Sequence, residues 1–228
     1  MDKGIGQVLK ALKDSGKEAN TLVVFLSDNG ASNKKLDEKS IEIRNPMNLR
    51  GQKASVWENG IRVPLLIRYP SKVAIGERQD FVMVEDLMPT ILDFCSISFS
   101  PKTPPSETGI SIKKNLTNSV PLPLDREALR MAISGKGSPT AKVGVAPTLE
   151  SLSFENMHLT LRGASYKLHS LPIGEKELYD IQKDPSESNN IIKDFPEIAL
   201  QMEQRLRDRW EKLLQVLESG DLVPHSSK

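Results

Sequence analysis

Residues 21–30 read Thr21-Leu22-Val23-Val24-Phe25-Leu26-Ser27-Asp28-Asn29-Gly30, an apolar run that stops abruptly at a polar turn. A short run of branched and aromatic side chains, ended by Ser, Asp, Asn and Gly, is typical of a buried β-strand. Buried strands of this kind belong to parallel sheets, which present polar side chains in the crevice beyond their carboxyl edge. Asp28 and Asn29 would offer oxygen atoms there, so both are candidate metal ligands.

The segments around this strand favour an α/β arrangement. Residues 2–15 have apolar side chains at helical spacing and a glycine just after them, which predicts a helix that packs with the strand on a parallel sheet. A second strand is expected at 65–70, and a helix at 82–97. The polar residues 31–47 predict a long exposed loop, and loops of this length are often functional.

The second half of the chain predicts a small antiparallel sheet and a long helix. Residues 158–161 and 166–169 are typical of a hairpin, 129–133 and 177–181 of further strands, and 196–217 of an amphipathic helix. Prolines among Ser and Thr at 98–107 mark a linker. We therefore expect an α/β domain at residues 1–100, a linker at 101–125 and a small α+β subdomain at 126–228.

Composition and charge exclude several classes of protein. The chain has 31 basic and 30 acidic side chains, and the basic ones are scattered, so a nucleic-acid partner is not expected. The apolar runs are only strand-sized, which predicts no membrane anchor. The N-terminus lacks the pattern of a secretory signal, and the single cysteine excludes an internal disulfide. None of these features indicates a compartment.

A second block follows at residues 49–64, and it carries a resemblance. Its residues Gly51, Lys53, Trp57, Glu58, Gly60, Arg62, Val63 and Pro64 match the pattern G-x-K-x-x-x-W-E-G-G-x-R-V-P of the sulfatase family. Asp86-Leu87-Met88-Pro89-Thr90 is similar to the family's D-x-x-P-T segment, and residues 177–190 to its E-L-Y-D-L-x-x-D-P-x-E-x-x-N segment. One departure is Asn59, where the family has glycine; a left-handed backbone there is tolerated by asparagine. Together with the Asp28-Asn29 turn, these blocks resemble the C-terminal part of a sulfatase.

The resemblance implies a fold and a site. The fold is α/β, a partial alkaline-phosphatase-like sheet with flanking helices plus a small C-terminal antiparallel-sheet and helix subdomain. Asp28 and Asn29 would bind a divalent cation, usually Ca²⁺, and Lys53 would contact the sulfate group, where an ammonium neutralises developing charge. Glu58 and Arg62 are expected to shape the turn through mutual or backbone contacts. The substrate would be a sulfated small molecule or sulfated carbohydrate.

The family's nucleophile is a formylglycine made from a cysteine in a C-x-P/A-x-R motif. Cys95 is followed by Ser96-Ile97-Ser98-Phe99, so it lacks that motif and is expected to be a buried structural thiol. His158, His169 and His225 are expected to be structural or exposed, because the family's catalytic histidines lie further upstream. No catalytic residue is therefore assigned, the nucleophile is expected upstream of this chain, and the chain alone is predicted to be inactive.

The calcium site is also expected to be incomplete. Ca²⁺ takes about 6–8 oxygen ligands, and Asp28 with Asn29 offer half of these at most. Three explanations stay open: a partial gene, a chain that associates with a separate N-terminal piece of the same enzyme, or a non-catalytic binding or interaction module derived from a sulfatase. A phosphate or phosphonate ester hydrolase of the same superfamily is a further alternative.

Overall fold

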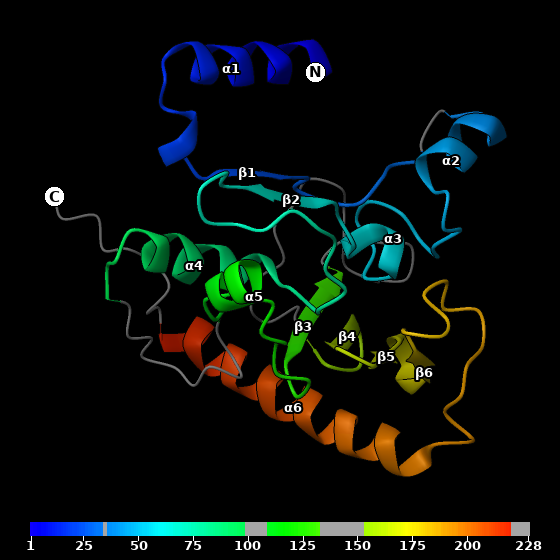
Figure 1. Ribbon diagram of the computed structural model, residues 1–228. Coiled ribbons are helices and arrows are strands. Elements are labelled where there is room, and N and C mark those ends of the chain that lie inside the picture. The colour runs from blue at the N-terminus through cyan, green and yellow to red at the C-terminus, as the bar shows by residue number, and fades with distance from the viewer. Residues whose placement is uncertain (34–35, 99–108, 133–152, 220–228) are drawn as a thin grey trace, which may run out of the picture. The chain divides into compact units, whose positions relative to one another are not determined.

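A computed structural model describes residues 1–33, 36–98, 109–132 and 153–219 (Figure 1). The chain divides into two compact units. The first combines Met1–Asp28 with Val63–Pro123, and the second combines Asn29–Arg62 with Leu124–Lys228. Part of the expected linker, residues 101–108, lies outside the described residues. The domain boundaries expected at 100 and 126 stay a prediction.

The first unit begins with helix α1 (Asp2–Asp14), the short 3-10 helix η1 (Glu18–Asn20) and strand β1 (Val23–Leu26), close to the predicted bounds. Strand β2 (Leu65–Arg68) pairs with β1, with Leu26 opposite Leu65 and Val23 opposite Arg68. The pair is antiparallel, so the expectation of a parallel sheet is wrong for these strands. The first residue of β2, Leu65, pairs with the last residue of β1, Leu26. The chain therefore enters β2 at the same end of the sheet at which it left β1, and the two strands run in opposite directions.

The other described elements of the first unit are helices: η2 (Val84–Asp86), α4 (Leu87–Phe94) and α5 (Lys113–Asn118). The D-x-x-P-T segment lies at the start of α4 and makes structural hydrogen bonds. The buried carboxylate of Asp86 accepts the backbone N–H groups of Met83 at 2.8 Å and Ile110 at 2.9 Å. The Thr90 hydroxyl donates to the carbonyl of Asp86 at 2.6 Å. This segment therefore joins α4 to the chain that follows it.

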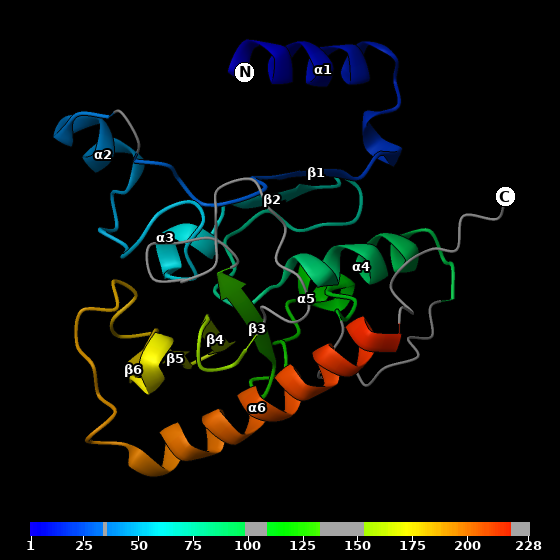
Figure 2. The same cartoon turned by 180° about the vertical axis from the view of Figure 1, so that it is seen from behind.

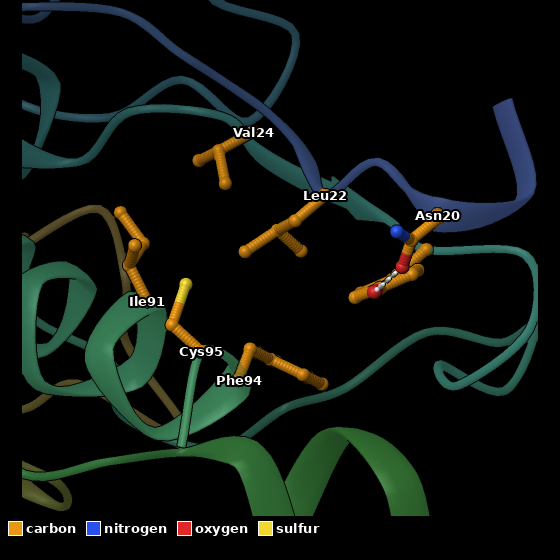
Figure 3. A pocket seen from close by; sticks show the side chains of 7 residues that line it. Asn20, Leu22, Val24, Ile91, Phe94 and Cys95 are labelled. Atoms are coloured by element: carbon orange, nitrogen blue, oxygen red, sulfur yellow. Dashed lines mark hydrogen bonds between the residues drawn. The ribbon is translucent and has the colours of Figure 1, made fainter. Parts of the chain in front are cut away.

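A cavity of about 330 Å³ lies between β1 and α4 (Figure 3). Its walls are mainly apolar, with a hydrogen bond of 2.9 Å from the Tyr69 hydroxyl to Asn20 at one end. The lining residues are Asn20, Leu22, Val24, Tyr69, Ile91, Phe94 and Cys95. Cys95 is exposed, so the expectation of a buried thiol is wrong. The reason is that α4 ends at Phe94, which leaves Cys95 as the cap residue beyond the packed helix face.

The second unit is built on a four-stranded antiparallel sheet. Its strands, in spatial order, are β3 (Glu127–Ala132), β4 (His158–Gly163), β5 (Tyr166–Ser170) and β6 (Lys176–Asp180). A single 3-10 turn, η4 (Pro172–Gly174), joins β5 to β6. The predicted hairpin and the strand after it are confirmed. Ile133, the last residue of the run expected at 129–133, lies outside the described residues.

Helix α6 (Pro196–Ser219) covers one face of this sheet, as both views of the ribbon show (Figures 1 and 2). The alternation of side chains along the strands gives that face an apolar core with α6. Its fully buried strand and helix residues are Leu159, Leu161, Leu168, Leu178 and Leu206. The antiparallel sheet and helix expected for this part of the chain are confirmed.

The second unit also contains two short helices, α2 (Glu38–Arg44) and α3 (Glu58–Ile61). The loop expected at residues 31–47 is thus partly helical. Asp37 caps α2, because its carboxylate accepts the backbone N–H of Ser40 at 2.7 Å. None of the helices in the described ranges combines the length and apolar character needed to cross a bilayer.

Candidate substrate and metal site

Two backbone hydrogen bonds join the Asn-Gly turn to the block that carries Lys53. The Gly30 N–H donates to the carbonyl of Gly60 at 3.0 Å, and the Lys53 N–H donates to the carbonyl of Ala31 at 2.7 Å. All four residues belong to the second unit, as does Asn29. The two sequence motifs therefore lie side by side, although about 20 residues separate them along the chain.

Glycine is the only residue type that fits at position 30, where the chain contacts the backbone of Asn59 and Gly60. A Cβ atom at this position would lie 1.8 Å from the carbonyl oxygen of Asn59 and 2.8 Å from the carbonyl carbon of Gly60. The backbone groups of the 49–64 block cannot move aside like the end of a flexible side chain. Glycine is thus required here because two stretches of backbone approach closely.

The block from Arg50 to Gly60 is held together by its own polar groups. The Asn59 N–H donates to the carbonyl of Arg50 and its side-chain Nδ2 donates to that of Gly51, each at 2.9 Å. Asn59 lies within α3 and is absent from the residues with positive φ, so the left-handed backbone expected for it is wrong. Its amide instead fastens the loop that precedes Lys53.

Lys53 lies at the exposed tip of this loop, between two left-handed residues. Gly51 has φ +85° and Ala54 has φ +72°. A left-handed alanine costs about 1–2 kcal/mol and persists only where the surrounding contacts impose it. The loop therefore holds Lys53 in a conformation that its local sequence does not favour.

Asp28 is exposed and is the last residue of the first unit; Asn29 is half-buried and is the first of the second. The Asn29 side chain donates from Nδ2 to the carbonyl of Gly30 at 3.3 Å. Together these two residues offer at most two carboxylate oxygens and one amide oxygen, whereas Ca²⁺ takes about 6–8 oxygen ligands. Among the described residues, no three His, Cys, Asp or Glu side chains gather into a group that could hold a metal ion. The side chains that the structure describes therefore do not by themselves fit a complete calcium site.

The sequence reasoning missed a cluster of charged side chains on the sheet face opposite α6. We define the buried charge cluster as Glu58, Lys167, His169 and Glu187, all of them at most 2% exposed. The Lys167 Nζ lies 3.0 Å from Oε1 of Glu58 and 2.8 Å from Oε1 of Glu187. Arg162 adds a second cation, with its Nε 3.2 Å from Oε1 of Glu58. The alternation of Lys167, Leu168 and His169 along β5 was the signal that these polar residues share a face.

Burial disfavours the charged form of Glu58, but Lys167 and Arg162 outweigh that effect and lower the pKa of its carboxyl below 4.5. Arg62 also contacts this carboxylate, at 4.0 Å, and its backbone N–H donates to the Glu58 carbonyl at 2.7 Å. The expected mutual and backbone contacts of these two residues are confirmed. The main partners of Glu58, however, lie more than 100 residues away.

Two histidines extend the buried charge cluster. His169 Nε2 lies 2.7 Å from Oε1 of Glu187, and His158 Nε2 lies 2.8 Å from Nδ1 of His169. Because a carboxylate only accepts, His169 donates from Nε2, and His158 then donates to its Nδ1. Burial, then His169 and Lys167, lowers the pKa of His158 to about 3, and burial, then Lys167 and Arg50, lowers that of His169 well below 6.5. Both are structural and neutral, as expected; His225 lies outside the described residues.

Trp57 joins the block to the same sheet face. Its ring stacks on His169 with a centroid separation of 4.0 Å, and the guanidinium carbon of Arg50 lies 3.5 Å from the ring centroid of Trp57. Arg50 also donates to the Tyr179 hydroxyl at 2.9 Å. Burial and the neighbouring Glu177 raise the pKa of Tyr179 to about 12, so the hydroxyl stays neutral. The second motif block thus packs on residues of the 177–190 segment.

The comparisons with known proteins agree with this arrangement. The family model described as Sulfatase matches residues 1–97. The chain is similar to arylsulfatase K of Mus musculus, with 26% identity over 209 residues, which is 90% of this chain and 33% of the relative. The family model and this relative support a member of the sulfatase family. It is also similar to the N-acetylglucosamine-6-O-sulfatase of Bacteroides thetaiotaomicron, with 28% identity over 195 residues, 84% of this chain and 30% of that protein.

Solved structures of sulfatases have the same fold. The crystal structure of Ps i-CgsB in complex with k-i-k-neocarrahexaose matches with a TM-score of 0.68 and 23% identity, over 92% of this chain and 40% of that chain. The chain spans about a third of the curated relatives named above and two fifths of that structure. The α/β fold class expected from the motifs is confirmed.

Proposed function

We propose that this chain is the C-terminal part of a sulfatase that hydrolyses sulfate esters, and that Lys53 contacts the sulfate group. The observation that carries the proposal is the pair of backbone hydrogen bonds between residues 30–31 and residues 53 and 60. They place Asn29, next to the proposed metal ligand Asp28, beside the loop whose exposed tip is Lys53. An oxygen-rich turn beside a loop that carries a lysine suits an anionic ester.

The nucleophile and part of the metal site are proposed to come from residues outside this chain. The single cysteine, Cys95, lacks the C-x-P/A-x-R context, and the chain spans about a third of its curated relatives. Asp28 and Asn29 would supply some of the oxygen ligands of Ca²⁺, which would act as a Lewis acid on the ester when bound. On this proposal the chain alone has no turnover and binds Ca²⁺ weakly.

The substrate class is proposed to be a sulfated carbohydrate or a sulfated small molecule. Support comes from the relatives, since one is named as an N-acetylglucosamine-6-O-sulfatase and one structural neighbour was solved with a carbohydrate bound. A sulfate ester carries one negative charge near neutral pH, which a single exposed lysine can balance. A phosphate monoester carries up to two negative charges. Because of this difference in charge, the relative rates on the two esters can distinguish a sulfatase from a phosphatase.

The test is a comparison of aryl sulfate and aryl phosphate hydrolysis by the full-length protein, and by this 228-residue chain alone. We expect the full-length protein to prefer sulfate and the chain alone to turn over neither ester. Preference for phosphate supports the phosphatase alternative. Absence of both activities in the full-length protein, with retained carbohydrate binding, supports the non-catalytic module and overturns the proposal.

A further inference from the structure

We propose that the buried charge cluster is a positioning device for Lys53, in which Lys167 and Glu187 hold the loop that carries it. This inference rests on the proposed function, because it treats Lys53 as the sulfate contact. Its members touch no substrate themselves. They act through the block from Arg50 to Gly60, which belongs to the same unit as the four-stranded sheet.

Hydrogen bonds within the block close the loop that carries Lys53, but contacts from outside it are also needed to hold its geometry. The only regular structure in residues 49–62 is α3, which has four residues, whereas isolated helices shorter than about 12 residues are marginal in water. The left-handed φ of Ala54, next to Lys53, is unfavourable for a residue with a side chain. Contacts from outside the loop must therefore impose this geometry.

The buried charge cluster supplies those contacts at the start of α3. Oε2 of Glu187 accepts the backbone N–H of Glu58 at 2.7 Å, while Lys167 binds the carboxylate of the same residue at 3.0 Å. His169, which hydrogen-bonds to Glu187, stacks under the preceding Trp57 at 4.0 Å. Backbone, carboxylate and ring are thus fixed by Lys167 and His169 of β5 and by Glu187 of the segment that follows β6. Few positions of Glu58 satisfy all three contacts.

One residue, Asn59, connects the contacts of Glu58 to the loop that carries Lys53. Asn59 follows Glu58 and donates two hydrogen bonds, to the carbonyls of Arg50 and Gly51, both at 2.9 Å. The loop that starts at these carbonyls carries Lys53, whose own N–H is then fixed to Ala31. A displacement of Glu58 therefore moves the start of the Lys53 loop, at Arg50 and Gly51, while the hydrogen bond from Lys53 to Ala31 stays in place.

Stability alone does not account for two carboxylates, an ammonium and a guanidinium on this face. Buried ion pairs often contribute little or nothing relative to apolar side chains of the same volume, because desolvation offsets their attraction. The sheet already has its apolar core on the α6 side. What charged pairs add is directional geometry, and here that geometry acts on the backbone next to Trp57 and Asn59.

The first test uses the near-isosteric substitution Glu187→Gln in this chain, with amide hydrogen exchange measured by NMR. We expect the Lys53 amide to exchange at least about tenfold faster, while the amides of Leu161 and Leu168 in the sheet change less than about twofold. The matched control is Glu203→Gln, which weakens the ion pairs of Glu203 with Lys176 and Arg207 in the same unit. Glu203→Gln should change the exchange rate of neither the Lys53 amide nor the amides of Leu161 and Leu168. An unchanged Lys53 amide in folded Glu187→Gln overturns the proposal.

The second test is a double-mutant cycle on sulfate ester hydrolysis by the full-length protein. Glu187→Gln should lower kcat/KM at least about tenfold in the wild type and have no further effect in a Lys53→Ala background, because it acts through that lysine. Independent effects of the two changes overturn the proposal. A wild-type protein without sulfatase activity contradicts the proposed function instead, and the exchange measurement still decides whether the cluster positions the loop. If Glu187→Gln does not fold, the double variant Lys167→Met with Glu187→Gln, which removes one charge of each sign, replaces it in both tests.

Discussion

Lys167 and Glu58 form an ion pair of 3.0 Å although 109 residues separate them in the chain. The lysine side chain is fully buried and the glutamate is 2% exposed. The pair links β5 of the C-terminal sheet to α3, which follows the Lys53 loop. The part of the chain with the proposed substrate contact and the part with the antiparallel sheet are therefore one folding unit, in keeping with the division of the molecule.

Lys167→Met should be strongly destabilising. It leaves the carboxylates of Glu58 and Glu187 buried without their shared ammonium, which typically costs about 3–5 kcal/mol. Trp57 and Trp210 both belong to the second unit, so tryptophan fluorescence in urea reports its unfolding. The control is Lys183→Met, which removes an exposed ion pair with Asp180 and should leave the urea midpoint nearly unchanged. Equal midpoints for the two variants would contradict a stabilising role for the buried ammonium.

Stability of the second unit should fall as the pH drops below 6.5. The folded state keeps His158 neutral down to a pKa of about 3, whereas the unfolded chain takes up the proton near 6.5. The contribution of this histidine is therefore complete above pH 6.5 and is lost progressively towards pH 3, by at most about 1.4 kcal/mol per pH unit. The pKa of His169 is lowered in the same direction.

Glu58 adds to this loss only at lower pH, since its pKa is lowered from 4.5. Between pH 6.5 and 5 the histidines should dominate. His158→Gln keeps a side-chain donor for His169 but cannot be protonated, so it should reduce the slope of stability against pH in that window. The measurement is the urea midpoint by tryptophan fluorescence at pH 5, 6 and 7. An identical slope in the variant would sink the assignment to His158.

Gly30→Ala should disrupt the junction between the two motif blocks. Its Cβ would meet the Asn59 carbonyl oxygen at 1.8 Å, so the hydrogen bond from residue 30 to Gly60 must break or the block must shift. We expect a loss of about 2–4 kcal/mol in the second unit, as for other overpacked and unsatisfied positions. Gly6→Ala is the matched control, because a Cβ there meets nothing within 4 Å. It should leave the tryptophan transition unchanged and increase helicity slightly.

Lys53→Ala should lower sulfate ester turnover by the full-length protein at least about tenfold, or roughly 1.4 kcal/mol of barrier. The side chain is exposed, and the hydrogen bond that holds this residue is the one from its backbone N–H to the carbonyl of Ala31, so folding should be unaffected. Lys39→Ala, at an exposed position of α2 in the same unit, is the control and should keep full activity. Unchanged kinetics for Lys53→Ala would remove this lysine from the proposed site.

The elements whose signals are local were predicted closely. The helix at the N-terminus, the strand before Asp28, the hairpin and the final helix depend on periodicity and turn residues within a few positions of each other. The expectations of a parallel pairing for β2 and of a buried Cys95 were wrong. Pairing direction depends on where the chain returns after 38 intervening residues, 27–64, and burial of a cap residue depends on what packs beyond the helix end.

The motif blocks, the acidic turn at Asp28 and the cationic residue Lys53 can all be read along the chain. The charge cluster cannot, because a lysine on an alternating strand looks the same whether its face meets water or two carboxylates. Only folding brings Glu58, Lys167 and Glu187 together. Local order follows from neighbouring residues, whereas the geometry that holds Lys53 follows from contacts more than 100 residues apart.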